Sequence, residues 1–369
     1  MYQRKNGVNL VTRIENIVNV IKSLGADAVL ITHSDNRLYA SGFISSAGNV
    51  YVTEDGEAYY LTDSRYLEAA GKELLEKSFK LADTTAGYIS VIKELNEKHG
   101  VKSLIIEDAH MSIGEYNNYK ENLGCELVFA GDKIDRLRSV LTIEDRNSLE
   151  LAETLASKAL EETLSSFKIG MTEKQLEAEL IYHMYMNGAD DLSFKPEIIS
   201  GANASMPHGN PSDKPIVEGD VLLMDFGLVK NGYWSDMSRT FAVGYATDEL
   251  TKVYYTVLEA QERAINGFRV GMTGKELDAI ARDYIEASGI DGCYQHALGH
   301  ACGLLGSAPT HLANRFSSDI MEVGNCLSFE PGIYQPGKLG CRIEDLVYLG
   351  EDGPYNCTHF PKKELIVLH

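Results

Sequence analysis

The sequence lacks the features that would direct it to a membrane or suit it to an oxidising compartment. No window holds eighteen consecutive apolar residues, and Met1–Gly7 contains no apolar stretch typical of a signal peptide. The six cysteines form no CxxC pair, a pattern that fits reduced thiols better than a disulfide framework. We therefore expect a cytoplasmic protein with no membrane partner.

Positive charge is also scarce. The chain has 34 lysines and arginines against 54 aspartates and glutamates, which gives a formal charge of −20. A chain of this charge repels nucleic acids and anionic membrane surfaces, so we expect neither as a partner. Net charge carries no information about the fold.

The chain, with 369 residues, is too long for one ordinary compact core, so two domains are expected. Helical and strand patterns alternate in the first part, where Ala28–Ile31 predicts a buried strand and residues 51–61 predict a hairpin. Thr142 can cap a long helix that follows. The predicted organisation is an α/β N-terminal domain over residues 1–138 and a second domain over residues 139–369.

The second domain contains an internal repeat. Lys168–Leu180 recurs as Arg269–Ala281, and each copy begins a helix with a capping box, in which Thr172 and Thr273 are the caps. A hairpin pattern with two acidic residues follows each copy. We interpret the repeat as two related halves packed about a pseudo-two-fold axis, each supplying two carboxylates to a central site.

The first acidic hairpin pattern carries Asp225 and Asp236. Asp225 ends an apolar run, and Asn231–Gly232 is typical of a two-residue hairpin turn. A turn at that position makes Asp225 face Ser238. Asp236 is then the diagonal neighbour of Asp225 on the same face of the hairpin.

The second acidic hairpin pattern carries Glu330 and Glu344. A loop centred on Gly337 puts these two glutamates directly opposite each other. Carboxylates in apolar strands are costly to bury unless a cation compensates them. Together with the two aspartates and His300, they form a set that suits two bridged divalent cations.

Around these residues the chain resembles the metallopeptidases with the pita-bread fold, the group of methionine aminopeptidases, prolidases and aminopeptidase P. The matching stretches are Ser200–His208, Met224–Gly227, Tyr233–Thr240, Gly299–Gly303, Glu330–Tyr334 and Arg342–Asp345. The first domain is similar to the creatinase/prolidase N-domain at Ala40–Phe43 and Tyr60–Tyr66. Methionine aminopeptidases usually lack that domain, so the resemblance favours the Xaa-Pro branch. It implies an α+β pita-bread catalytic domain with an internal pseudo-two-fold repeat.

The resemblance also implies a role for each ligand. Asp225 and Asp236 bind one metal ion, Asp236 and Glu344 bridge the two ions, and His300 with Glu330 completes the second. Glu330 is also the expected general base. Two-metal hydrolysis needs cations about 3.5–4 Å apart that activate a water and polarise the scissile carbonyl. These ligands leave the metal open among manganese, cobalt, iron and zinc.

Three further residues are expected near the substrate or the ligands. His208 lies in a loop where it can hydrogen-bond the substrate, and His296 would share a helical face with His300 if that segment is helical. The matching family histidine helps to orient substrate, although packing alone explains His296 equally well. Arg342 is expected to support the ligand set. The alternative for the carboxylates is solvation, or ion pairs with Arg239 and Arg342.

The chain departs from the family pattern seven residues after His300, where relatives usually carry another histidine in a His-Glu pair. Ser307 and Ala308 stand there instead, and whether His311 compensates is open. The usual histidine binds substrate and stabilises the oxyanion, and removing one oxyanion donor costs about 10²–10³ in rate. The departure leaves the predicted metal ligands intact and removes a polar group from the substrate side.

We expect a peptidase with two divalent metal ions that removes the N-terminal residue of short peptides, chiefly at Xaa-Pro bonds, with activity that Ser307 impairs or alters. The first alternative is a degenerate family member that binds metal or peptide and cleaves poorly. The second is a hydrolase of a non-peptide C–N bond. Relatives are commonly dimers, so the resemblance also implies a homodimer.

Overall fold

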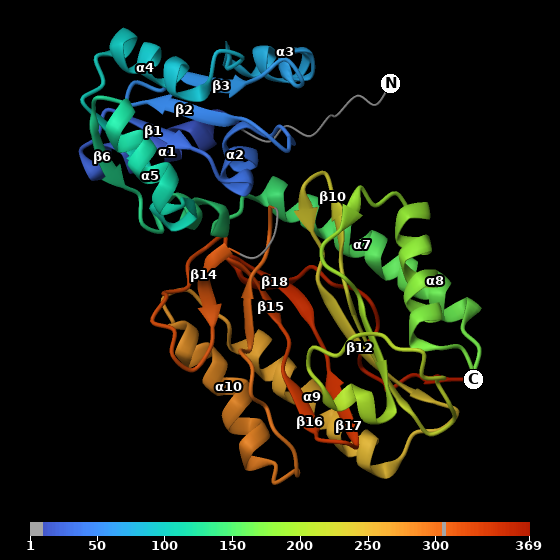
Figure 1. The fold of residues 1–369 in the computed structure, drawn as a ribbon. Helices are drawn as coiled ribbons and strands as arrows, with labels where there is room; N and C mark the ends of the chain where they lie inside the picture. Colours follow the sequence, from blue (N-terminus) through green and yellow to red (C-terminus); the bar gives the residue numbers. More distant parts are fainter. Residues whose placement is uncertain (1–9, 305–307) are drawn as a thin grey trace. The chain divides into compact units, whose positions relative to one another are not determined.

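The computed structural model describes residues 10–304 and 308–369. The chain divides into two compact units, Met1–Arg138 and Ser139–His369 (Figure 1). Within the described residues, no helix has the length and apolar character needed to cross a membrane. Each unit is described below by itself.

Unit 1 is built on one six-stranded sheet in the order β4-β3-β2-β1-β5-β6. Its strands are β1 (Ala28–Ile31), β2 (Asn49–Thr53), β3 (Ala58–Thr62), β4 (Lys80–Asp83), β5 (Ser103–Ile106) and β6 (Glu126–Phe129). Its α-helices are α1 (Leu10–Leu24), α2 (Ser34–Ser41), α3 (Leu67–Leu74), α4 (Tyr88–His99), α5 (Ile113–Asn122) and α6 (Lys133–Arg136). This is the predicted α/β fold.

The sheet of unit 1 forms because its central strands are apolar on both faces. All four residues of β1 are fully buried, as expected of a strand covered on both sides. β1 pairs with β5 in parallel and with β2 in antiparallel orientation. The predicted hairpin is present as β2 and β3. The carboxyl ends of β1 and β5 therefore lie at the same edge of the sheet.

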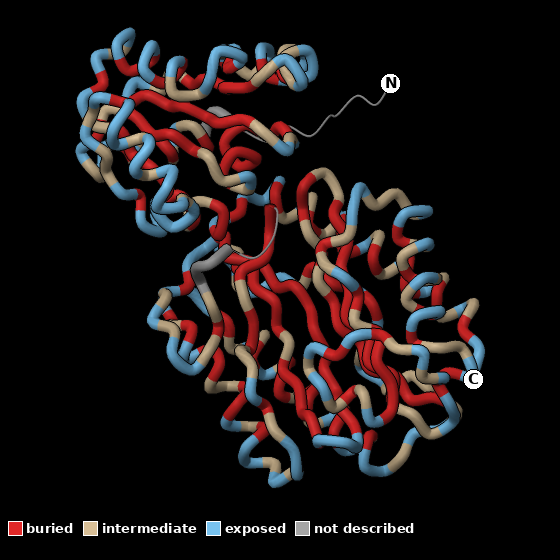
Figure 2. Tube along the Cα trace, in the orientation of Figure 1, coloured by how far each residue is buried: buried red, intermediate tan, exposed pale blue. Residues whose placement is uncertain are grey.

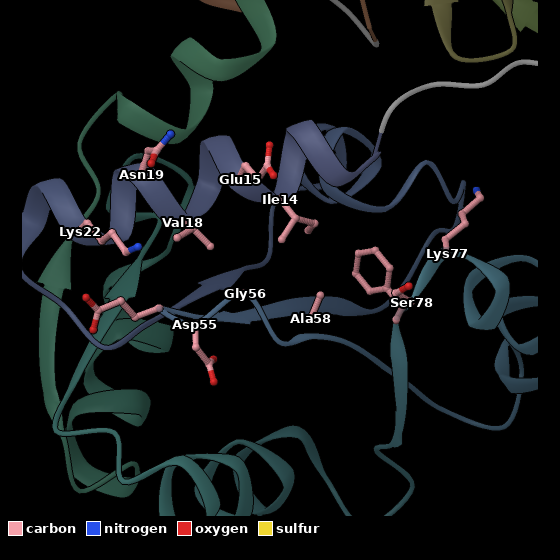
Figure 3. A pocket seen from close by; sticks show the side chains of 12 residues that line it. Ile14, Glu15, Val18, Asn19, Lys22, Asp55, Gly56, Ala58, Lys77 and Ser78 are labelled. Carbon is pink, nitrogen blue, oxygen red and sulfur yellow. The ribbon is translucent and has the colours of Figure 1, made fainter.

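A cavity of about 460 Å³ lies beside α1 in unit 1 (Figure 3). The turn at Asp55 and Gly56 and the start of β3 at Ala58 lie across from the helix, which contributes Val18 and Lys22. None of the residues predicted to form the functional site lines this cavity.

Unit 2 contains two long helix pairs and several antiparallel ladders (Figure 1). The helices are α7 (Ile143–Ser166), α8 (Glu173–Met186), α9 (Asp248–Gly267) and α10 (Gly274–Ala287). The capping boxes predicted at Thr172 and Thr273 begin α8 and α10, and Thr142 caps α7. Residues of α7 and α8 share one hydrophobic cluster with the strands, and those of α9 and α10 share a second, so the repeat is a structural one.

The strands of unit 2 that position the site come from both halves of the repeat. They are β8 (Glu197–Ser200), β9 (Val221–Phe226), β10 (Leu228–Lys230), β11 (Tyr233–Trp234), β12 (Met237–Val243), β13 (Gly299–Ala301), β15 (Cys326–Phe329), β16 (Gly332–Gln335), β17 (Leu339–Arg342) and β18 (Asp345–Gly350). Figure 2 shows these central strands as the most buried part of the unit.

The remaining strands extend these ladders at their edges. They are β7 (Asp191–Leu192), β14 (Ala308–Ala313), β19 (Gly353–Asn356) and β20 (Val367–Leu368). The sheets have the orders β20-β12-β9-β8, β14-β13-β15-β18-β19, β11-β10-β7 and β16-β17.

Candidate functional site

The first acidic hairpin has the predicted register. Asp225 in β9 is paired with Ser238 in β12. Asn231 has φ 53° and the glycine after it has φ 84°, the left-handed geometry that a tight two-residue turn requires. Asp236 lies just before β12, in a break between the ladders. Gly227 makes this break possible, because a Cβ there would lie 1.9 Å from the carbonyl oxygen of Ser235.

The second acidic hairpin also has the predicted register. Gly332 pairs with Arg342 and Gln335 with Leu339, and the same register extended outward puts Glu330 opposite Glu344. Neither glutamate lies in the ladder itself. Glu330 follows β15, and Glu344 separates β17 from β18.

His300 reaches the site from β13. Its backbone N–H donates to the Ser328 hydroxyl at 3.1 Å. The preceding Gly299 allows this close approach, because a Cβ there would lie 1.8 Å from the carbonyl oxygen of Ser328. The segment before β13 is irregular, so the condition under which His296 and His300 would share a helical face is not met.

The structure brings the five predicted ligands, Asp225, Asp236, His300, Glu330 and Glu344, together in one cluster, which we call the cage. Three overlapping groups each have one potential ligand atom per residue within 4.8 Å of the others. They are Asp225, Asp236 and Glu344; His300, Glu330 and Glu344; and Asp236, His300 and Cys302. Cys302 is the one member that the sequence did not indicate.

Burial raises the pKa values of Asp236, Glu330 and Glu344, and neighbouring acids add to the effect. Burial and the neighbouring Glu344 raise the pKa of Asp236 well above its usual value. Burial, Glu330 and Asp225 do the same for the pKa of Glu344. Burial lowers the pKa of His300, but the Cys302 thiol and Glu330 outweigh it and raise that pKa to about 10. Protons therefore compete with a cation for these side chains.

The cage fits a divalent cation by a second observation. Asp225 is 8% exposed, and its Oδ1 atom is buried with no hydrogen-bond partner in the part of the chain that the structure describes. A buried carboxylate oxygen without a donor costs free energy unless a cation meets it. Four carboxylates and one imidazole are donors that manganese, cobalt, iron and zinc accept.

Arg342 supports the cage from within the protein. Its guanidinium donates to the Asp225 carboxylate, to the Ser238 hydroxyl at 2.8 Å and to the Tyr334 hydroxyl at 2.8 Å. The Ser238 hydroxyl in turn donates to Glu344 at 2.8 Å. Arg342 is 1% exposed, so it is a buried partner of the predicted ligands and not a surface ion pair.

Glu197 is a site residue that the sequence did not reveal. It begins β8 and pairs directly with Asp225 in β9. One carboxylate oxygen lies 3.3 Å from Arg342, and the other lies 3.1 Å from Nδ1 of His208. Burial and the Asp225 charge raise the pKa of Glu197. The run Ile198–Ile199 predicts a strand, but only its pairing with β9 shows that the glutamate reaches the site.

Glu153, in α7, is a second residue that the sequence did not reveal. It is fully buried, and its two oxygens accept the Asp236 N–H at 2.7 Å and the Thr358 hydroxyl at 2.8 Å. Burial raises the pKa of Glu153 to about 7. Glu153 thus holds the backbone of Asp236 in place, and both of the groups that donate to it are neutral.

A cavity of about 380 Å³ gives access to the cage. Its lining includes the predicted ligands together with Phe194, Glu197, Pro207, His208, His296 and Arg342. The His208 side chain is 85% exposed, and Nε2 of His296 lies 3.0 Å from the Tyr334 hydroxyl. His208 and His296 thus border the space where a substrate would lie.

Two residues of the sequence argument cannot be placed. Ser307 lies outside the described residues. The side chain of His311 also lies outside the described part, although its backbone belongs to β14.

The chain is similar to known peptidases in sequence. Residues 147–351 match the profile of metallopeptidase family M24, and residues 13–140 match the creatinase/prolidase N-terminal domain. An uncharacterized peptidase, YqhT, from Bacillus subtilis is 38% identical over 96% of this chain and 100% of its own. An Xaa-Pro dipeptidase from Pyrococcus furiosus is 33% identical over 94% of this chain and 97% of its own.

Two solved structures are similar to this chain over nearly its whole length. The Xaa-Pro dipeptidase from Bacillus anthracis has a TM-score of 0.91 and 34% identity, covering 98% of this chain and 100% of that one. The prolidase from Pyrococcus horikoshii has a TM-score of 0.87 and 30% identity, covering 96% and 100%. The expected pita-bread fold with a separate N-terminal domain is confirmed.

Proposed function

The chain belongs to metallopeptidase family M24, and on that basis we propose that it is a dinuclear-metal peptidase that removes the N-terminal residue of short peptides at Xaa-Pro bonds. The observation that carries the proposal is the convergence of four carboxylates and one imidazole at a cavity of about 380 Å³. The names of the similar proteins from Pyrococcus furiosus and Bacillus anthracis support the Xaa-Pro specificity.

Each predicted ligand has a place in this proposal. Asp225 with Asp236 would hold one ion, His300 with Glu330 the other, and Asp236 and Glu344 would bridge them. Two divalent ions bound there would polarise the scissile carbonyl and activate a water. Mn²⁺, Co²⁺, Fe²⁺ and Zn²⁺ all suit these donors.

The protein's own groups supply proton transfer and orientation. Glu330 has a side chain 18% exposed and borders the cavity, so it can accept a proton and return it to the leaving amide nitrogen. His208 borders the same space and can donate a hydrogen bond to the substrate carbonyl. The Glu197 carboxylate, on the cavity wall, can accept hydrogen bonds from the free amino terminus of a peptide.

The second candidate function is metal or peptide binding with little cleavage. Ser307 favours it, because relatives usually carry a histidine there and that histidine stabilises the oxyanion. In this case Ser307→His should increase the rate of Xaa-Pro cleavage. The upper limit of the gain is the contribution of one oxyanion donor, about 10²–10³-fold. No gain across a panel of Xaa-Pro substrates would show that Ser307 does not limit the rate. Hydrolysis of a non-peptide C–N bond is tested by intact-mass analysis of products from amide substrates.

The proposal is tested by metal reconstitution. The full chain is loaded separately with manganese, cobalt or zinc and assayed on Xaa-Pro dipeptides and on longer Xaa-Pro peptides. We expect turnover with at least one metal, and loss of both turnover and metal in Asp236→Ala. Asp213→Asn, which changes an exposed acid paired with Lys174, is the matched control and should behave as the native chain.

Two outcomes would overturn the proposal. Calorimetry that finds unchanged metal stoichiometry in Asp236→Ala would contradict the cage. Native metal binding without turnover of any Xaa-Pro substrate would favour the binding function. Homodimerisation and a cytoplasmic location stay predictions, and light scattering on the purified chain tests the first.

A further inference from the structure

Unit 1 contains a second cluster of metal-ligating side chains, unrelated to the cage in unit 2. His33 follows β1, His110 ends the short 3-10 helix η2 (Asp108–His110) after β5, and Asp135 lies in α6. The first two come together because β1 and β5 are parallel neighbours and end at the same edge of the sheet. Residues beyond the carboxyl ends of parallel strands commonly form binding sites.

The three side chains are close enough to share an ion. The rings of His33 and His110 are stacked, with centroids 3.9 Å apart and planes inclined by 17°. Nε2 of His110 lies 2.9 Å from an oxygen of Asp135. One ring nitrogen of each histidine and one oxygen of Asp135 all lie within 4.8 Å of one another. Zinc bonds of about 2.0–2.2 Å in a tetrahedron put ligands about 3.3–3.6 Å apart. The two stacked rings must therefore turn relative to each other so that one nitrogen of each faces the ion.

An ordinary ion pair does not account for the whole cluster. It explains the contact between His110 and Asp135, but it leaves His33 without a role. Nδ1 of His33 is buried and has no hydrogen-bond partner among residues 10–304 and 308–369. Such a buried nitrogen costs free energy unless a proton donor or a cation meets it.

The cluster is also held in place by a surrounding network. Glu107 accepts the backbone N–H of His33 at 2.8 Å and the side-chain amide of Asn36 at 2.6 Å. The same amide donates to Asp135 at 2.9 Å. Metal ligands are typically oriented by such hydrogen-bonded partners. Arg138 lies 3.3 Å from Asp135 and compensates part of the negative charge of this network.

We propose that His33, His110 and Asp135 form a binding site for a single borderline divalent cation, with Zn²⁺ as the best match. Two imidazoles and one carboxylate leave a fourth tetrahedral position for water. The ion would link the end of β1, the end of β5 and α6. Its role would be to stabilise unit 1, because the three ligands come from segments far apart in the sequence.

The test uses the full chain and zinc alone. After equilibrium dialysis against zinc chloride, bound zinc is counted by mass spectrometry in the native chain, in His110→Gln and in His99→Gln. His99 is the matched control, since it is a histidine of unit 1 that also lies near a carboxylate, 3.6 Å from Glu57. We expect His110→Gln to lose one zinc per chain and His99→Gln to lose none. All three chains share unit 2, so zinc bound there cancels in the comparison.

Two further measurements locate the ion. Anomalous diffraction at the zinc edge should show a peak in bonding distance of His33, His110 and Asp135. Zinc should raise the melting temperature of the unit 1 transition in the native chain and not in His110→Gln. Should His110→Gln fold poorly, His33→Gln is counted in its place. An unchanged zinc count in both variants, or anomalous peaks only in unit 2, would overturn the site.

Discussion

Two acids that are neighbours in the sequence, Glu344 and Asp345, have opposite surroundings. Asp345 is fully buried and contacts Arg239 at 2.8 Å, Asn356 at 2.7 Å and the Lys362 ammonium. Although burial raises it, the two cations hold the pKa of Asp345 below its usual value. Glu344, equally buried, has other acids as close neighbours and a raised pKa.

The different surroundings of Asp345 and Glu344 distinguish an acid that stabilises the fold from an acid that needs an external cation. The protein supplies two positive charges for Asp345, so the negative charge of that residue is compensated within the folded chain. For Glu344 it supplies the Ser238 hydroxyl, and Arg342 must serve several acids at once. The proposed metal centre is thus distinguished by having more buried carboxylates than buried cationic side chains.

The largest expected effect is that of Glu344→Gln on metal-dependent activity. Glutamine keeps an acceptor for Ser238 but removes a bridging charge, so we expect activity to fall by more than about 10³-fold. Removing even a hydrogen-bond partner of a ligand costs about 10–100-fold, and removing the ligand itself should cost more. The measurement is Xaa-Pro turnover at saturating metal.

The same substitution should stabilise the metal-free chain. The unfolded chain does not bring the acids together, so replacing Glu344 by a neutral residue relieves a penalty of the folded state alone. We expect the free energy of unfolding at pH 7 to rise by about 1–3 kcal/mol in urea titrations with a chelator present. A stability loss together with retained activity would show that Glu344 is a structural acid like its neighbour.

Asp345→Asn should have the opposite pattern. It leaves Arg239 and Lys362 buried beside a neutral side chain, and breaking such a pair costs about 3–5 kcal/mol of stability. The folded fraction should bind metal with nearly native affinity. Urea unfolding checks the first expectation and calorimetry the second. Loss of less than 1 kcal/mol, or loss of metal at native stability, would remove the distinction between the two acids.

Sequence reasoning predicted the parts of this site that local signals determine. The turn at Asn231–Gly232 fixes the register that places Asp225 near Asp236, and the two capping boxes reveal the repeat. A hairpin register depends on the turn alone, so it can be derived without the rest of the chain. The ligands Glu330 and Glu344 follow from the same rule.

What sequence reasoning missed depends on contacts between distant segments. Glu197 reaches the site only because β8 pairs with β9, and Glu153 only because α7 packs beneath Asp236. The cluster of His33, His110 and Asp135 likewise depends on the order of strands in a parallel sheet. Neither hydrophobic periodicity nor turn chemistry contains that order.

Arg342→Lys tests how much the shared cation contributes to the cage. Lysine keeps one charge but cannot match the planar fork that contacts Asp225, Ser238 and Tyr334 together. We expect metal affinity to fall by about 10–100-fold, measured by calorimetry. Arg37→Lys is the control, because Arg37 is also buried but lies in unit 1, where it donates to the Gly48 carbonyl oxygen. Equal losses in both variants would mean that the effect is general destabilisation.

The smallest expected effect is that of a substitution at Asp27 in unit 1. Unlike Asp345, this acid is not held by buried cations, and unlike Glu344 it has no cluster of acids around it among the described residues. Its carboxylate accepts the backbone N–H groups of Lys102 at 2.8 Å and Ser103 at 2.9 Å, which tie the start of β1 to the start of β5. These hydrogen bonds lower the pKa of Asp27 below 3.8. Asp27→Asn should therefore cost about 1–2 kcal/mol at pH 7.

The pH dependence follows from the direction of that pKa shift. A carboxyl group with a lower pKa in the folded chain contributes stability above its unfolded pKa, and that contribution is lost as the pH falls through the folded pKa. The cost of Asp27→Asn should stay constant from pH 7 to about 5 and shrink as the pH drops below about 4, in urea unfolding of unit 1. Asp132→Asn, which removes a surface ion pair with Arg136, should change little at any pH. A cost that grows toward low pH would show that backbone amides do not hold Asp27 in its charged form.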